Sequence, residues 1–149
     1  MNKDHAASAL ADVSRTEQRL AERARWPFYR HAMFGLAEGL IVAGLAQPIR
    51  MTGAMTAVAL ALIVVCLMDD RRQRGMFVSG WRMGATLPFT ILLSLFLIVM
   101  AVLSVGLRDG VSTQPLGLLA GAFTFVVATW ASFRWERIYQ SELGRGGQR

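Results

Sequence analysis

Four long apolar stretches occupy most of this 149-residue chain, and they constrain its fold more than any other feature. Residues 51–68, 83–107 and 110–133 contain no charged side chain, and residues 31–49 contain a single acid, Glu38. A bilayer core about 30 Å thick needs about 20 helical residues to cross it, which is roughly the length of each stretch. Because a backbone in lipid must satisfy its own hydrogen bonds, only helices and closed barrels span a membrane. Continuous rather than alternating hydrophobicity favours helices.

The sequence therefore predicts an all-α fold, an integral membrane four-helix bundle that follows an N-terminal cytoplasmic or interfacial helix. Residues 1–30 are predicted to form a cytoplasmic amphipathic segment, and residues 31–149 a membrane domain with a short cytoplasmic tail. The predicted spans are residues 31–48, 52–68, 87–107 and 115–133. Since only a few residues around Pro48 connect the first two spans, we expect these to form an antiparallel hairpin.

Positive charge is concentrated on one side of the predicted spans. Fourteen of the sixteen Lys and Arg residues lie in residues 1–30, 69–86 or 134–149, whereas the other two connections contain only Arg50 and Arg108. Basic segments stay on the cytoplasmic side, so we expect a multi-pass protein with its N- and C-terminal segments in the cytoplasm. Arginine outnumbers lysine fifteen to one, which suggests a GC-rich bacterium and hence the bacterial inner membrane. Topology thus accounts for the net charge of +6, and we expect no nucleic-acid partner.

A helix is predicted within the N-terminal segment, because Ser14 and Glu17 have the spacing of a capping box. Arginines repeat along this helix at four-residue intervals, and further arginines follow the second span. We predict that both groups contact anionic lipid; they are Arg15, Arg19, Arg23, Arg71, Arg72 and Arg74. A solvated cytoplasmic helix is the alternative for the N-terminal segment, since its apolar face is mostly alanine.

Glu38 is the only acid inside a predicted span, and it should face the bundle interior because a carboxylate in hydrocarbon is costly. With His31, it is our candidate intramembrane site. Three roles are open to Glu38: binding a proton or cation during transport, contacting a partner subunit, or forming a structural hydrogen bond or ion pair. His31 precedes Glu38 by seven residues, hence on the same helix face but about 10 Å away along the axis, and an interfacial position is its alternative.

Small residues recur at four-residue steps on three of the predicted spans. Such faces allow helix backbones to approach closely, which drives helix association in membranes. We expect these faces to pack within the bundle, notably between the first two spans, or against another chain. The residues are Gly35, Gly39 and Ala43 in the first span, Gly53, Ala57 and Ala61 in the second, and Gly117 and Gly121 in the fourth.

No enzyme motif is found in the sequence: it has no Gly-x-Ser-x-Gly elbow, no phosphate-binding loop and no Cys-x-x-Cys pair. The single cysteine, Cys66, lies within the second apolar stretch. Zinc requires clustered His, Cys or carboxylate ligands, and the two histidines, His5 and His31, do not favour haem ligation within a bundle. We therefore expect no metal, no cofactor and no enzymatic activity.

The sequence best fits a small polytopic inner-membrane protein that acts as a non-enzymatic accessory, assembly or regulatory subunit. Its expected partners are the lipid bilayer and either other membrane-protein subunits or copies of itself. The alternative is a small homo-oligomeric transporter or channel, coupled to protons or cations through Glu38.

Overall fold

The computed structural model describes residues 26–74, 84–108 and 114–146, and within these ranges it is all-helical. Its helices are α2 (Phe28–Leu45), α3 (Ile49–Arg74), α4 (Leu87–Gly106) and α5 (Gln114–Gly146). Proline marks the beginning of each helix, where its missing N–H is not needed. Pro27 precedes α2, Pro48 precedes α3, and Pro88 and Pro115 lie in the first turns of α4 and α5.

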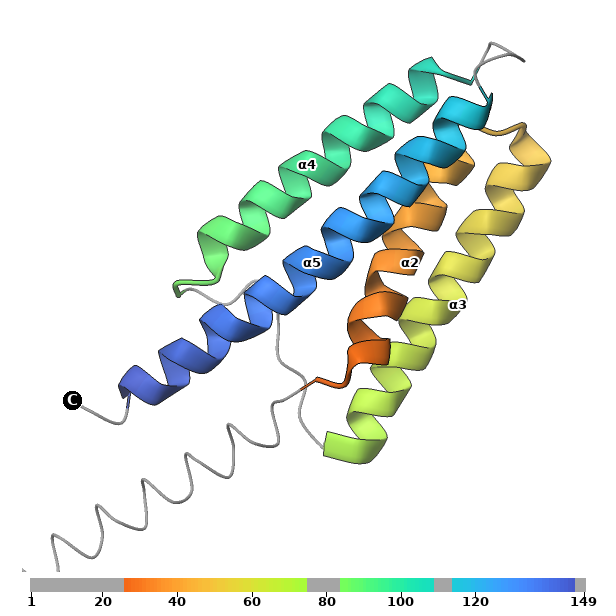
Figure 1. Ribbon diagram of the computed structural model, residues 1–149. Helices are drawn as coiled ribbons and strands as arrows, with labels where there is room; N and C mark the ends of the chain where they lie inside the picture. Colours follow the sequence, from red (N-terminus) through yellow and green to blue (C-terminus); the bar gives the residue numbers. More distant parts are fainter. Residues whose placement is uncertain (1–25, 75–83, 109–113, 147–149) are drawn as a thin grey trace, which may run out of the picture.

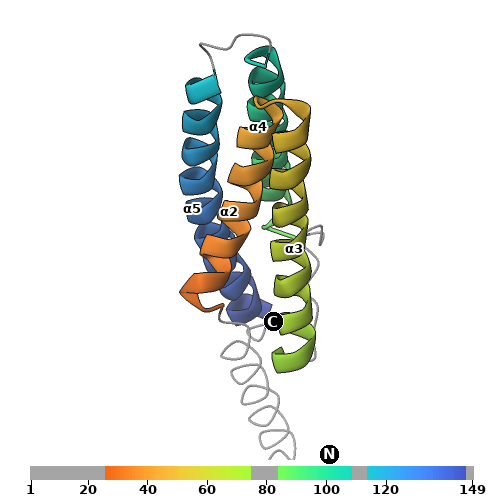
Figure 2. The same cartoon turned by 90° about the vertical axis from the view of Figure 1, so that its right-hand side faces the viewer.

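The four helices run alternately up and down, and α2 lies at the centre of the arrangement (Figures 1 and 2). Helix α2 packs most extensively against α5 and then against α3, with smaller contacts to α4. Helix α4 also contacts α5, whereas α3 packs mainly on α2. As a result, α3 and α4 stand on either side of α2 (Figure 1).

The predicted hairpin of the first two spans is present as α2 and α3. Residues 46–48 join the two helices. The hydroxyl of Thr52, in the first turn of α3, lies 2.7 Å from the carbonyl oxygen of Gly44 and 2.9 Å from that of Gln47. This hydroxyl therefore interacts with carbonyl groups at the C-terminal end of α2 that its last turn leaves without an intrahelical donor.

Three of the four helices, α3, α4 and α5, are long and apolar enough to cross a membrane. The qualifying segments are Ile49–Asp69, Leu87–Gly106 and Gln114–Ser141. Helix α2, which was also predicted to span, does not qualify: its 18 residues include Arg30, His31 and Glu38, so it offers no stretch as apolar as the qualifying segments. Neighbouring helices pack on three sides of α2 and offer its polar residues protein contacts in place of lipid.

Close packing between α2 and α5 decides which small-residue faces meet. A Cβ atom added at Gly39 would lie 2.7 Å from the carbonyl oxygen of Gly121, and one added at Gly121 would lie 2.5 Å from the Cβ of Ala43. Gly35 and Gly117 are equally enclosed, against Thr129 and Ala46 respectively. The face of the first span thus packs within the bundle, as expected, but its partner is the fourth span rather than the second. Physically, α2 and α5 both present glycine at the crossing, which lets two backbones approach.

The small residues of α3 are placed differently. Nothing lies within 4 Å of a Cβ atom added at Gly53, and Ala57 and Ala61 are exposed. The contact between α2 and α3 instead uses Gly44, whose added Cβ would lie 3.2 Å from the Cβ of Met55, and the fully buried Ala59.

Helix boundaries differ from the predicted spans at the charged ends. Helix α3 continues beyond residue 68 to Arg74, and α5 continues beyond residue 133 to Gly146. Charged residues end an apolar stretch but do not end a helix, because arginine, glutamine and glutamate are good helix formers in water. The predicted N-terminal helix, with Arg15, Arg19 and Arg23, lies outside the described residues.

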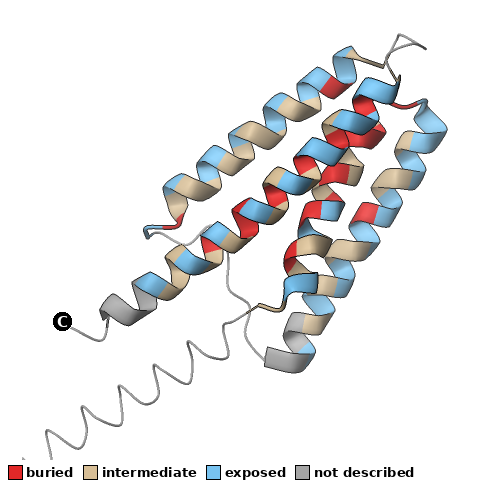
Figure 3. Ribbon diagram, viewed as in Figure 1, coloured by how far each residue is buried: buried red, intermediate tan, exposed pale blue. Residues whose placement is uncertain are grey.

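Buried residues lie mainly where α2 faces α5, and the outer sides of α3 and α4 are exposed (Figure 3). Many exposed side chains of α3 and α4 are large and apolar; Leu60 is 55% exposed and Val102 66% exposed. In a soluble protein, such apolar surfaces mark interaction sites. We therefore expect lipid or a partner protein to cover these faces of α3 and α4.

Candidate functional site

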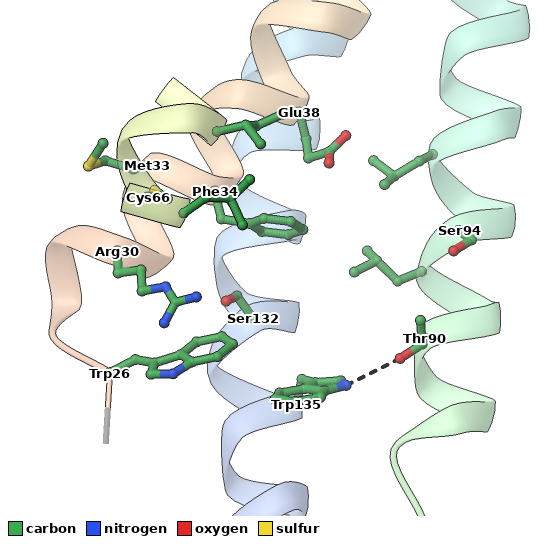
Figure 4. Close-up of a pocket in the computed structure, with 14 residues that line it drawn as sticks. Trp26, Arg30, Met33, Phe34, Glu38, Cys66, Thr90, Ser94, Ser132 and Trp135 are labelled. Atoms are coloured by element: carbon green, nitrogen blue, oxygen red, sulfur yellow. Dashed lines mark hydrogen bonds between the residues drawn. The ribbon is translucent and has the colours of Figure 1, made fainter. Parts of the chain in front are cut away.

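A cavity of about 400 Å³ lies between α3 and α4, with α2 and α5 forming its remaining walls (Figure 4). Its lining is mostly apolar and comes from all four helices. The residues are Trp26, Arg30, Met33, Phe34, Glu38, Ile63, Cys66, Leu67, Thr90, Leu93, Ser94, Leu97, Ser132 and Trp135. The cavity exists because α3 and α4 both pack on α2 without closing on each other. Its size is within the range of small-molecule sites, about 300–1,000 Å³.

Glu38 projects from α2 into this cavity, toward α4 (Figure 4). Among the described residues, the Glu38 carboxylate takes part in no hydrogen bond or ion pair, although the side chain is partly buried. The structural alternative for this residue, a hydrogen bond or ion pair to a neighbouring helix, is therefore not realised within the described part of the chain. Glu38 is instead the one acidic group among the described residues that line the cavity.

Stacked aromatic rings close the cavity at the end where α2 begins. The Arg30 guanidinium lies 3.7 Å from the centre of the Trp26 ring, a cation–π contact. Trp26 stacks on Trp135 at a ring separation of 5.5 Å, and Trp135 stacks on Tyr139 at 5.3 Å. The Trp135 indole N–H also donates to the Thr90 hydroxyl, 3.2 Å away (Figure 4). This stack joins α2, α4 and α5 at one end of the bundle.

A buried polar cluster lies behind the stack, between α2 and α5. His31 is fully buried; its Nδ1 is 2.8 Å from the Ser132 hydroxyl, and its Nε2–H donates to the Glu136 carboxylate at 2.9 Å. The other carboxylate oxygen of Glu136 accepts the backbone N–H of Trp26 at 3.0 Å and the amide of Gln140 at 2.9 Å. Glu136 therefore holds the residues at the beginning of α2, whose N–H groups have no intrahelical acceptor.

Ser132, His31 and Glu136 have the residue types of a nucleophile, base and acid triad, but their surroundings favour a structural role. Acyl transfer also requires N–H donors aimed at the developing oxyanion. Ser132 lies within α5, where the backbone N–H groups bond along the helix. The arrangement acts as a hydrogen-bonded clamp between α2 and α5.

His31 and Glu38 do not form one site. Glu38 lines the cavity, whereas His31 points into the contact with α5. Ser132 and Glu136 were not predicted from the sequence as partners of His31. Their spacing of four residues places them on one helix face, which was the available signal.

The predicted lipid-contacting arginines that the structure describes lie in α3, toward the same end of the bundle. Arg72 is exposed in the last turns of α3, and Arg71 and Arg74 belong to the same helix. Nearby, the Tyr29 hydroxyl donates to the Asp69 carboxylate at 2.6 Å, which ties the beginning of α2 to α3. Within the described residues, no group of three His, Cys, Asp or Glu side chains is placed to hold a metal.

Comparison of this chain with known protein families, with curated proteins and with solved structures finds no match.

Proposed function

We propose that this chain is a four-span protein of the bacterial inner membrane, and that it is a non-enzymatic accessory, assembly or regulatory subunit. Three candidate transmembrane helices support the membrane location. The beginnings of α2 and α4 and the ends of α3 and α5 lie at one end of the bundle (Figure 1). The C-terminal parts of α3 and α5 include basic residues, namely Arg71, Arg72, Arg74, Arg134 and Arg137. By the positive-inside rule, this end faces the cytoplasm.

We propose that the outer face of α3 contacts another membrane protein. The exposure of small residues on this face is the main support for the subunit function. The small-residue faces of α2 and α5 pack against each other, whereas the small-residue face of α3 is exposed. At 100° per residue, it is opposite the side of α3 that packs on α2. The face consists of Gly53, Ala57, Leu60, Ala61, Val64 and Met68. It offers both close backbone approach and apolar knobs, as helix partners in membranes require.

Affinity purification in a mild detergent, with the particle mass and co-purifying chains measured, tests this proposal. Ala57→Leu and Ala61→Leu add bulk to the exposed face of α3 without touching the bundle interior, so they should reduce the yield of the associated chain. Val102→Leu on the outer face of α4 is the matched control and should leave the association intact. A monomeric particle without any associated chain would contradict the proposal.

A second candidate function is a homo-oligomeric transporter or channel coupled to protons or cations. The position of Glu38 in the cavity favours it. A clean homo-oligomer in the same mass measurement would support this function, and Glu38→Gln should then abolish flux in liposomes while the oligomer persists. Unchanged flux in Glu38→Gln would argue against it.

A further inference from the structure

The cavity combines apolar walls with a single carboxylate that no described residue neutralises. Of the described residues that line it, two are charged, Glu38 and Arg30. Arg30 lies over the Trp26 ring at the closed end of the cavity, eight residues before Glu38 and hence about 12 Å from it along the helix axis. The carboxyl group of Glu38 is therefore presented to an apolar space at some distance from that cation.

The depth of Glu38 restricts what can approach it. It lies about two helical turns inside the end at which the basic residues gather, so a lipid headgroup held at the membrane surface would not reach it. A cation that binds to Glu38 must leave water and enter the apolar cavity. The loss of hydration free energy is largest for compact, strongly hydrated ions, and it is smaller for a cation whose charge is delocalised or surrounded by apolar groups.

We infer that the cavity between α3 and α4 is a binding site for a lipophilic cation, with Glu38 as its counter-charge. The apolar side chains of Ile63, Leu67, Leu93 and Leu97, from the two flanking helices, contact the organic groups of the ligand. Phe34 supplies an aromatic ring beside the carboxylate (Figure 4). This inference goes beyond the proposed subunit function, since the cavity is on the side of α3 opposite its exposed face, and binding there does not require a partner chain.

Tetraphenylphosphonium and tetraphenylborate test this inference, because they have nearly the same shape and opposite charge. Binding of each to the purified chain in lipid discs would be measured by equilibrium dialysis. We expect saturable binding of tetraphenylphosphonium and no saturable binding of tetraphenylborate. This comparison uses the unaltered chain and does not depend on whether a variant folds.

Two substitutions then locate the site. Glu38→Gln should weaken tetraphenylphosphonium binding by about tenfold or more, the effect expected from losing one charged contact, and Glu38→Asp should retain most of it. Val102→Leu changes an exposed residue on the outer face of α4, outside the cavity, and should leave the affinity unchanged. Equal saturable binding of both ions, no saturable binding of the cation, or wild-type affinity in folded Glu38→Gln would overturn the inference. Loss of cation binding would leave the particle-mass result, and hence the proposed subunit function, unaffected.

Discussion

Replacing Gly39 with alanine tests the close contact between α2 and α5. The added Cβ would lie 2.7 Å from the carbonyl oxygen of Gly121 and 3.0 Å from the Cβ of Phe125. Carbon–oxygen contacts in proteins are about 3.3–3.6 Å, so the two helices would have to part by roughly 0.6 Å at this point. Neither obstacle is the end of a flexible side chain, and the strain cannot be relieved by a rotamer change.

Two opposing effects determine the free energy of unfolding of Gly39→Ala. Overpacking costs about 1–3 kcal/mol, whereas alanine favours the helix over glycine by about 0.5–1 kcal/mol. Because the obstacle is backbone, we expect the cost to dominate and the free energy of unfolding to fall by about 1–2 kcal/mol. Gly53→Ala is the matched control on α3: nothing lies within 4 Å of its added Cβ, so only the helix effect remains and stability should rise by about 0.5–1 kcal/mol.

Unfolding by titration with SDS in mixed micelles, followed by circular dichroism, measures both variants under the same conditions. The two should differ by about 2 kcal/mol, with Gly39→Ala below the wild type and Gly53→Ala at or above it. Equal transition midpoints for the two variants would refute the close approach of α2 and α5 at Gly39.

Two further substitutions test the contacts at the beginning of α2. Glu136→Gln removes the charged group that accepts hydrogen bonds from the Trp26 backbone and the His31 ring. It should lower the free energy of unfolding by about 1.5–3 kcal/mol and alter tryptophan fluorescence. An unchanged midpoint of the SDS titration would contradict the clamp between α2 and α5. Tyr29→Phe removes an exposed hydrogen bond to an α3 carboxylate, so it should cost less than about 1 kcal/mol in the same titration, and a larger loss would show that this bond is better shielded from water than the structure indicates.

Glu38 illustrates how far the candidate site could be predicted. Its isolation in an apolar stretch marked it as the residue that must face other protein groups rather than lipid. The cavity into which it points could not be predicted, because that space depends on α3 and α4 packing on α2 without meeting each other. His31 shows the opposite case: the sequence identified a polar residue of the first span, but its partners Ser132 and Glu136 are about one hundred residues away along the chain.

Local sequence is enough to predict the number of helices in the described residues and their approximate bounds. The prolines indicate where each helix begins, and the length of each apolar stretch indicates how much of the helix is apolar. It also identifies the small residues that allow close packing. Which of those faces meet is settled by the tertiary packing, in which α2 lies on α5 and the face of α3 is left exposed. The physical reason is that small residues permit close approach on any helix that carries them, while the choice of partner depends on the shapes of both surfaces, which a local pattern does not contain.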